Sequence, residues 1–478
     1  MAMQETNYTP TIGLEIHAEL KTKTKMFCNS KNDPDEDRPN VNVCPVCMGH
    51  PGTLPVINKE AVKHVLKVGL ALGGELADFT EFDRKNYFYP DIPKGYQISQ
   101  YKYPLVKGGA LHGIAITRVH LEEDTGTSKH EEGDFSLVDY NRAGVPLMEL
   151  VTEPIIHTAE DAANFAKELQ LLLRYLGAGE ANMEKGEMRV EANISVSAEV
   201  GKLGRKVEVK NLNSFRAVER AINYEVKRHI DLLEQGETIV QETRGWDEVK
   251  GATFSQRKKE DSHDYRYFPD PDLPKLHISE IQEFHADVLK KEIGELPSEK
   301  RERYKKEFGL KDEDIEIYIG SPEWGRYFET LIADFKGNTK LVMLASNYLT
   351  SDLIGLVKKE PAVWEKKQIE HKSFAALIKM LGENKLNSRG AKDILTILYK
   401  EGGDPEKIAE DKDMLQKNDE GELKKAIEKI VVDNPKVVAD YKAGKEAALQ
   451  FLIGQAMKAT RGSANPELLR NLFKSSII

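Results

Sequence analysis

The sequence predicts an α+β protein in which a largely antiparallel sheet domain is followed by all-helical C-terminal domains. From about Thr11 to Pro274 the chain reads as short strands broken by Gly, Pro, Asn and Asp, with many aromatic residues. From about Leu296 onward it becomes rich in Lys, Glu, Leu and Ala at helical spacing. Prolines in the segment 270–274 favour an extended connection between the two regions. The predicted domains are residues 1–294, 295–405 and 406–478.

Helices are also expected inside the sheet domain and near the end of the chain. Residues 159–176 form one candidate, which ends before Gly177. A second begins after Ser214, a favoured N-cap residue, and its apolar positions repeat at helical spacing: Val218, Ile222, Val226, Ile230 and Leu233. Asn465 and Pro466 offer a cap and a first-turn proline for a last helix, whose buried face consists of Leu468, Leu469, Leu472 and Phe473.

The composition limits the class of protein. The 478 residues are 40% hydrophobic and 31% charged, as in soluble globular proteins, and no stretch approaches the ~18 consecutive apolar residues of a membrane span. Residues 1–10 are polar and contain no signal-peptide segment, and three cysteines argue against a disulfide framework. We therefore expect a cytoplasmic protein. The net charge of −10 weighs against nucleic-acid binding, although a local basic patch can coexist with an acidic surface.

Four predicted strands carry the residue types of a catalytic site on one face. Because side chains alternate along a strand, Glu15, His17 and Glu19 share one side of the strand 12–20, opposite a wholly apolar side. The polar faces of the other three strands carry Arg118, His120 and Glu122, then Arg189, Glu191, Asn193 and Ser195, and then Glu208 and Lys210.

A sheet with one solvated face is the simpler explanation for any single strand of this kind. Four such strands favour a site, because water-facing strands usually carry Lys, Thr and Ser rather than clustered Glu, His and Asn. Carboxylate oxygens suit Mg²⁺, which also binds substrate phosphates. The imidazole of His17 is an unusual addition to that set, so a purely structural His–Glu pair is the alternative.

Seven longer motifs, in order, resemble the B subunit of the glutamine-dependent amidotransferases that act on Glu-tRNA(Gln) or Asp-tRNA(Asn). They are GLEIHAEL (13–20), FDRKNYFYPD (82–91), KGYQISQ (94–100), HLEEDTG (120–126), DYNRAGVPLME (139–149), KNLNSF (210–215) and DYRYFPDPD (264–272). GQAMKA (454–459) and GSANP (462–466) are similar to the end of the same family. The resemblance therefore runs almost from end to end.

This resemblance implies a division of labour between three chains. A glutaminase A subunit supplies ammonia through an internal channel, and a small C subunit braces the pair. The B subunit is a carbon–nitrogen ligase: its catalytic cradle domain, similar to glutamine synthetase, holds the acceptor end of a mischarged tRNA and activates the side-chain carboxylate with ATP. The sequence does not say whether Glu-tRNA(Gln), Asp-tRNA(Asn) or both are substrates.

The resemblance also implies site residues. The metal candidates are Glu15, His17, Glu122, Glu123 and Glu149. Glu122 and Glu123 should point to opposite faces if their strand continues. The candidates for catalysis or for contacts with ATP and the aminoacyl group are Lys85, Arg84, Lys94, Arg189, Glu191, Asn193 and Lys210. Arg84 and Lys85 alternatively pair with acids such as Asp83 and Asp91. The chain lacks a Walker-type phosphate loop, so ATP must be held in another way.

Two further groups are weighed against simpler explanations. Tyr87, Tyr89 and Tyr96 are candidates for stacking on a terminal adenosine, although aromatic residues in such segments are more often core. Zinc is a further candidate, because cysteine pairs of this kind form zinc sites. Ser30 stands where some relatives have a fourth cysteine, so the candidate ligands are Cys28, Cys44, Cys47 and His50.

The helical tail is a candidate tRNA contact, similar to YqeY. Its basic positions Lys442, Lys445, Lys458 and Arg461 suit phosphates, while a solvated helix face is the alternative for any one of them. Two other functions compete with the ligase. One is a non-catalytic tRNA-binding scaffold, and the other is a free-standing metal-dependent hydrolase or kinase that acts on a small molecule.

Overall fold

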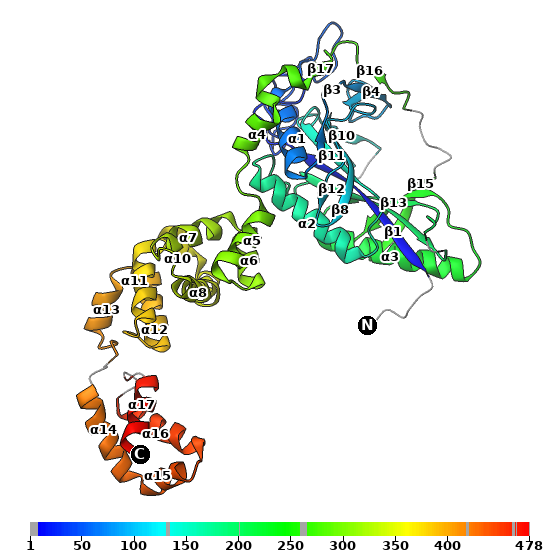
Figure 1. The fold of residues 1–478 in the computed structure, drawn as a ribbon. Coiled ribbons are helices and arrows are strands. Elements are labelled where there is room, and N and C mark those ends of the chain that lie inside the picture. The colour runs from blue at the N-terminus through cyan, green and yellow to red at the C-terminus, as the bar shows by residue number, and fades with distance from the viewer. Residues whose placement is uncertain are drawn as a thin grey trace. The chain divides into compact units, whose positions relative to one another are not determined.

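A computed structural model describes residues 8–130, 134–199, 201–258, 265–416, 420–460, 464 and 466–477. The chain divides into two compact units, Met1–Pro297 and Ser298–Ile478 (Figure 1). The first unit is built on a sheet and the second is helical, so the predicted α+β fold class is confirmed. The three-domain division at residues 294 and 405 stays a prediction.

A ten-stranded sheet forms the frame of the first unit, in the order β15-β14-β13-β12-β1-β11-β8-β6-β2, with β7 also paired to β8. Its pairs are antiparallel except for β13 with β14. The strands are β1 (Thr9–Glu19), β2 (Glu75–Leu76), β6 (Val106–Lys107), β7 (Ala110–Leu111), β8 (Ile114–Glu123), β11 (Pro146–Thr152), β12 (Met188–Ser197), β13 (Val207–Leu212), β14 (Glu242–Asp247) and β15 (Ala252–Lys258).

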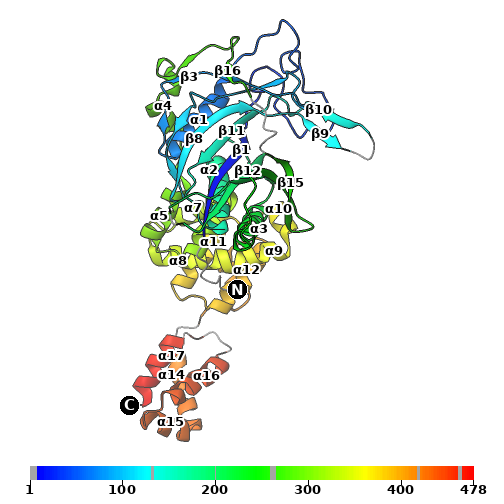
Figure 2. The same ribbon diagram turned by 90° about the vertical axis from the view of Figure 1, so that its right-hand side faces the viewer.

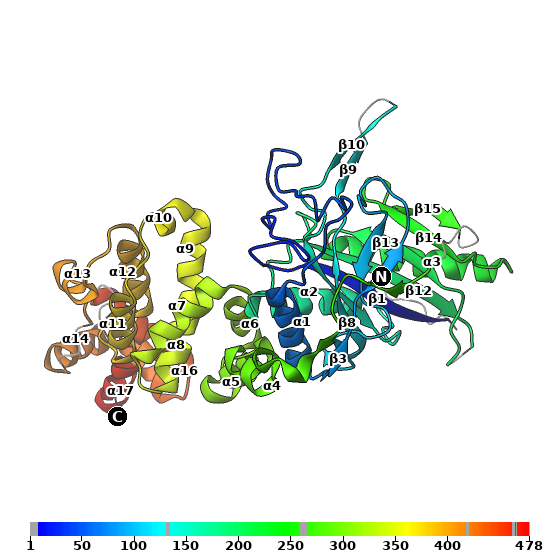
Figure 3. The ribbon, with the colours of Figure 1, turned by 90° about the horizontal axis from the view of Figure 1, so that it is seen from above.

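Three small sheets surround this frame. They pair β9 (Thr127–His130) with β10 (Ser136–Asp139), β4 (Asp83–Asn86) with β5 (Tyr96–Ser99) and β16 (Phe268–Pro269), and β3 (Phe79–Thr80) with β17 (Leu276–His277). The hairpin of β9 and β10 reaches outward from the large sheet in two perpendicular views (Figures 2 and 3). Sheet β16-β4-β5 supplies one wall of the candidate site.

Helices pack on the apolar face of the large sheet. Ile12, Leu14 and Ile16 of β1 are fully buried there, in one core with α1 (Lys59–Ala71), α2 (Ala159–Tyr175) and α3 (Phe215–Glu234). The alternation predicted for β1 and β12 is therefore confirmed. In β8 a β-bulge lies opposite Val151 and Thr152, which pair with Arg118 and Ile116 and leave one residue of β8 unpaired between them. The bulge explains why Ile116 joins the core although it alternates in phase with the polar residues of that strand.

The predicted helix starts follow from their capping residues. Ser214 Oγ accepts a hydrogen bond of 3.0 Å from the backbone N–H of Ala217, and Thr158 caps α2 in the same way through Asp161. The unit ends with two short 3₁₀ turns (Ile278–Glu280 and Gln282–Phe284) and α4 (Ala286–Glu292).

The second unit consists of helices in the part of the chain that is described. They are α5 (Pro297–Phe308), α6 (Asp312–Gly320), α7 (Pro322–Ala333), α8 (Thr339–Asn347), a π-helical turn (Tyr348–Leu353), α9 (Ile354–Lys359), α10 (Pro361–Lys366), α11 (His371–Gly382), α12 (Ser388–Lys400), α13 (Pro405–Asp411), α14 (Glu420–Asp433), α15 (Pro435–Lys442), α16 (Glu446–Ala459) and α17 (Pro466–Ile477). The last four helices share a core that includes Ile427, Leu452 and Phe473. Asn465, the predicted cap of α17, lies outside the described residues. Within those residues, no helix combines the length and the apolar character needed to cross a membrane.

Candidate active site

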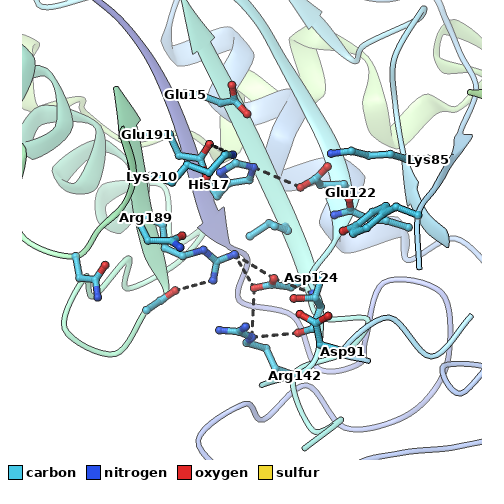
Figure 4. Close-up of a pocket in the computed structure, with 17 residues that line it drawn as sticks. Glu15, His17, Lys85, Asp91, Glu122, Asp124, Arg142, Arg189, Glu191 and Lys210 are labelled. Carbon is cyan, nitrogen blue, oxygen red and sulfur yellow. Dashed lines mark hydrogen bonds and ion pairs between the residues drawn. The ribbon is translucent and has the colours of Figure 1, made fainter. Parts of the chain in front are cut away.

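The polar face of the large sheet lines a pocket of about 530 Å³. Its walls come from β1, β4, β5, β8, β11, β12 and β13 and from loops, among them those that follow β4, β8 and β10. Figure 4 shows Glu15, His17, Glu191 and Lys210 along one wall and Lys85 with Glu122 across from them. Asp91, Asp124 and Arg142 gather at the end of the pocket away from Glu15 (Figure 4).

A row of four paired residues crosses the sheet under this pocket. His17 in β1 pairs with Arg189 in β12 on one side and with Glu149 in β11 on the other, and Glu149 pairs with His120 in β8. Nε2 of His17 lies 3.4 Å from Glu149 Oε2, and Nε2 of His120 lies 3.3 Å from the same oxygen. Glu122 Oε1 is 3.6 Å from His17 Nε2. The sheet register thus collects acids and imidazoles from three strands.

The close packing of these charges shifts their proton affinities. Burial would lower the pKa of His17, but its hydrogen bond to Glu149 and the charge of that acid outweigh burial and raise the pKa to about 9. Glu149 is buried, which opposes its charge, yet the two imidazoles hold its pKa well below the ordinary value. Burial and the nearby Glu149 and Glu191 raise the pKa of Glu15 to about 7. The acids around His17 therefore favour a positive charge at this position, and a divalent cation bound there would take the place of the imidazole proton.

Three overlapping sets of side chains have ligand atoms close enough to hold one metal ion. They are Glu15 with His17 and Glu149, His120 with Glu122 and Glu149, and Glu15 with Glu191 and Glu208. Within each set all ligand atoms lie within 4.8 Å of one another. The carboxylate of Glu15 makes no hydrogen bond and no ion pair among the described residues. Carboxylate-rich sets with one imidazole or none fit a divalent cation of the Mg²⁺ class.

Cations face these acids, and they differ in how they are held. Lys210 forms ion pairs with Glu191 and, at 3.2 Å, with Glu208. Arg189 binds Asp124 through two contacts of 2.9 and 3.0 Å. Both cations are thus neutralised by protein acids.

Lys85 is different, because no carboxylate of the described residues pairs with it. Its Nζ lies 4.9 Å from the ring centroid of Tyr265 and 5.8 Å from that of Tyr87, and it makes no hydrogen bond or ion pair with any residue that the structure describes. Burial would lower the pKa of Lys85, but the combined effect of Glu122, Tyr267, Tyr87 and Glu149 outweighs burial and raises it. Lys85 therefore stays charged and is available to an anionic ligand.

Several predicted site residues lie outside this pocket. Arg84 binds Asp270 and Asp272, each at 2.8 Å, and covers the ring of Tyr96. Its acidic partners differ from the alternatives predicted from the sequence, Asp83 and Asp91. Glu123 points away from Glu122, as the alternation predicted, and forms an ion pair with Lys94. The side chain of Asn193 is not among the pocket walls, and its Oδ1 is buried without a hydrogen bond in the described structure.

Other residues in the pocket, or in the metal-ligand sets beside it, were not singled out from the sequence. His120 stood on a predicted polar face and was left out of the ligand set, although alternation places it beside Glu122. Asp91, Asp124 and Arg142 lie in or next to loops, where alternation gives no signal. Of the candidate tyrosines, Tyr87 lines the pocket, whereas Tyr89 is 59% exposed and Tyr96 lies beneath Arg84.

A separate thiol cluster lies next to the Lys94–Glu123 pair. The sulfur atoms of Cys28, Cys44 and Cys47 lie within 4.8 Å of one another, and Ser30 Oγ is 3.9 Å from Cys47 Sγ. Among the described residues His50 lines the same small cavity but does not join this ligand group. The cluster thus offers three thiols and a hydroxyl, an incomplete set for a structural zinc ion. Zinc stays a prediction.

Comparison with known proteins gives matches along nearly the whole chain. A family model for the GatB/GatE catalytic domain matches residues 10–283, and a model for a GatB domain matches residues 326–477. The chain is 44% identical to the B subunit of the aspartyl/glutamyl-tRNA(Asn/Gln) amidotransferase of Caldanaerobacter subterraneus subsp. tengcongensis, with 98% of this chain and 99% of that one covered. Proteins of the same description from Thermotoga maritima and Persephonella marina are 43% and 41% identical, over 98% of this chain and 98% and 99% of theirs.

Proposed function

Because the chain belongs to the GatB/GatE family, we propose that it is the B subunit of a cytoplasmic, tRNA-dependent amidotransferase. It uses ATP to activate the side-chain carboxylate of mischarged Glu-tRNA(Gln), Asp-tRNA(Asn) or both. Ammonia from a glutaminase A subunit then forms the amide, and a small C subunit completes the complex.

The observation that carries this proposal is the meeting of an acidic metal-ligand set with an unpaired lysine in one pocket. Glu15, His17 and Glu149 offer donors within 4.8 Å of one another. Lys85 lies across the same pocket with its charge uncompensated by any carboxylate within ion-pair distance in the described chain. An ATP molecule with its divalent cation fits this arrangement, because the cation binds the acidic ligand set and the phosphates bind Lys85.

The chemistry explains why such residues suffice. A carboxylate resists ammonia because its carbon is electron-rich and its leaving group would be an oxide. Transfer of the γ-phosphoryl group from ATP forms an acyl phosphate and releases ADP. Ammonia then attacks the acyl carbon, inorganic phosphate leaves, and the amide remains. Phosphoryl transfer requires positioning and charge neutralisation rather than a covalent protein intermediate.

The residues of this chain divide these tasks. Glu15, His17 and Glu149 are the proposed metal ligands, with Glu122 and His120 adjoining them. A bound Mg²⁺ ion supplies charge neutralisation at the ATP phosphates. Lys85 contacts the transferred phosphoryl group. Lys210 and Arg189, held by Glu191 and Asp124, shape the wall against which the nucleotide and the aminoacyl group lie.

The helical tail is proposed to contact the body of the tRNA. Lys442, Lys445 and Lys458 are exposed, and Lys445 has an exposed ion pair with Asp440 at 2.8 Å that a phosphate can replace. Arg461, the fourth predicted contact, lies outside the described residues. Such contacts would add affinity without reading base sequence.

The direct test replaces Glu15 by Gln in the complex with the A and C partners. Glu15→Gln keeps the size of the side chain and removes its charge, so tRNA-dependent ATP cleavage and amidation should fall by at least about a hundredfold. The A subunit should still hydrolyse glutamine, at a lower rate if that reaction is coupled to carboxylate activation in this chain. ADP release and amidation are measured with Glu-tRNA(Gln) and with Asp-tRNA(Asn).

Glu219→Gln is the matched control, because Glu219 is exposed on α3 and lies away from the pocket. Normal amidation by Glu15→Gln would refute the metal assignment. A wild-type complex that binds mischarged tRNA without cleaving ATP would identify a scaffold instead. Turnover of a small molecule without partners or tRNA would identify a free-standing enzyme.

A further inference from the structure

One acid of the pocket has no task in the proposed reaction. Asp91 lines the pocket, and its carboxylate forms no hydrogen bond and no ion pair among the residues described. Its Oδ1 atom is buried and has no hydrogen-bond partner in the described part of the chain. The neighbouring acids differ, because Asp124 binds Arg189 and Glu191 binds Lys210. Apart from Glu15, which belongs to the metal-ligand set, Asp91 is the unsatisfied carboxylate of this pocket in the described structure.

The backbone holds Asp91 firmly in this position. The N–H of Gly126 donates to the carbonyl of Asp91 at 2.8 Å, and the N–H of Ile92 donates to the carbonyl of Tyr89 at 3.0 Å. The hydroxyl of Tyr140 donates to the carbonyl of Pro90 at 2.7 Å. These three contacts hold the backbone of the turn, so the side chain of Asp91 starts from a fixed place in the pocket wall, and rotation of its carboxylate can bring it to a ligand.

The nearby cations are already engaged. Arg142 donates from Nε to the carbonyl of Thr125 at 3.1 Å and from Nη2 to that of Gly126 at 3.2 Å. Lys94 binds Glu123 outside the pocket. A buried carboxylate oxygen without a donor is costly, and a positively charged donor from a ligand would remove that cost. The ligand group that best satisfies Asp91 is therefore an ammonium group.

The proposed substrate carries such a group. An amino acid esterified to tRNA through its α-carboxyl keeps its α-amine, which is separated from the side-chain carboxylate by a short carbon chain. Figure 4 places Asp91 at the end of the pocket away from Glu15, with Lys85 on the wall between them. A substrate whose side-chain carboxylate faces Lys85 and the metal ligands can therefore direct its amine toward Asp91.

We propose that Asp91 binds the α-ammonium group of the esterified amino acid and thereby selects tRNA that carries a free amino acid. This inference rests on the function proposed above, because it assumes that the aminoacyl group enters this pocket. It assigns Asp91 to substrate selection: an acylated or peptidyl α-nitrogen bears no charge and cannot satisfy the carboxylate.

The test compares two substrates in the assembled complex. One is Glu-tRNA(Gln), and the other is the same tRNA acetylated on the α-amine, which leaves the side-chain carboxylate unchanged. The variant is Asp91→Asn, and Asp287→Asn on the exposed surface of α4 is the matched control. The readout is kcat/KM for amidation of each tRNA, with ammonium chloride as the nitrogen donor.

We expect the wild-type complex to favour the free amine by about tenfold to a hundredfold, the range of a charge-assisted hydrogen bond. Asp91→Asn should lose most of that factor on Glu-tRNA(Gln) and change the acetylated substrate by less than about twofold. Asp287→Asn should behave as wild type. Equal losses on both substrates, or no loss on either, would overturn the assignment.

Two further outcomes separate the assignment from the general function. A wild-type complex that amidates neither of these tRNAs and does not amidate Asp-tRNA(Asn) would refute the proposed function, and Asp91 with it. A wild-type complex that amidates both tRNAs equally would refute Asp91 alone. If Asp91→Asn lowers the thermal transition of the complex, Asp91→Ser provides the same comparison without an amide donor, and the ratio of the two kcat/KM values decides.

Discussion

Arg84 and Lys85 are adjacent in β4, and the alternation of side chains sends them to opposite sides of the strand. Lys85 lines the pocket, whereas Arg84 is held by Asp270 and Asp272. The same rule separates Glu122 from Glu123 at the end of β8. In each of these two strands, alternation therefore places only one of the two adjacent charged residues in the pocket.

This separation gives a prediction for Lys85. Lys85→Met keeps much of the stem and removes the charge, so ATP-dependent amidation should fall by about tenfold to a hundredfold. The exposed Lys102, which follows β5, is the control, and Lys102→Met should leave the rate within about twofold. Steady-state kinetics with ATP as the varied substrate measures the effect. Equal rates for both variants would contradict the assignment of Lys85.

Residue patterns predicted part of this site and not the rest. Glu15 and His17 were found because β1 alternates without interruption between core and pocket. Asp91, Asp124 and Arg142 were missed because they stand outside regular strands, where no period orients a side chain. Lys94 and Arg84 were selected because they lie in motifs that resemble the family and because they are positively charged. Their acidic partners come from distant parts of the chain, and the sequence gives no indication of those pairs.

At the scale of elements, α1 carries a histidine on its buried side. Nε2 of His64 lies 3.0 Å from the carbonyl of Lys21, and its Nδ1 is buried without a hydrogen-bond partner in the described structure. Burial lowers the pKa of His64 below its ordinary value of 6.5, although the contact with Lys21 opposes that shift. The helix therefore packs with a neutral imidazole.

A pH dependence of stability follows from this burial. Below pH 6.5 His64 is protonated in the unfolded chain but stays neutral in the folded protein. The free energy of unfolding therefore decreases as the pH falls, and it becomes constant below the pKa of His64 in the folded state. His64→Gln should reduce the loss of stability between pH 7.5 and pH 5.5, as measured by thermal denaturation. His112→Asn, at an exposed position with a left-handed backbone, should leave the loss unchanged. An unchanged loss in His64→Gln would contradict the prediction.

The starts of the helices were predicted from the sequence, whereas the irregularity in the strand β8 beside the site was not. The helices after Thr158 and Ser214 begin where their caps predicted, because a side-chain oxygen satisfies the first free N–H groups. The bulge in β8 was not predicted, since it depends on pairing with β11 rather than on local sequence. The polar row of β8 nevertheless reaches the pocket, because the bulge lies before His120 and Glu122.

At the scale of the whole molecule, the last four helices have a core of their own. A chain that ends at residue 416 should therefore keep the first unit intact and lose the proposed tRNA contact. In the assembled complex we expect KM for mischarged tRNA to rise by about tenfold while kcat changes little, with a weaker dependence on salt.

Variants that remove only the positive charges of the tail show whether the effect of the truncation comes from those charges or from the loss of the helices. Lys442, Lys445 and Lys458, changed together to Gln, should reproduce the higher KM. The matched triple change of Lys425, Lys436 and Lys474, which are also exposed in the tail, should not. An unchanged KM in the truncated chain would show that the tail does not contact tRNA during turnover.

The cross-strand row of Arg189, His17, Glu149 and His120 has a consequence for how the enzyme comes into being. A slip of one residue along β1 would turn Glu15 and His17 into the core and expose Ile16 to the pocket, a costly exchange. Burial of the hydrophobic core therefore fixes the strand register that places the candidate site residues. When Ile16 is buried in the core, the same strand register places Glu15 and His17 on the pocket side of the sheet.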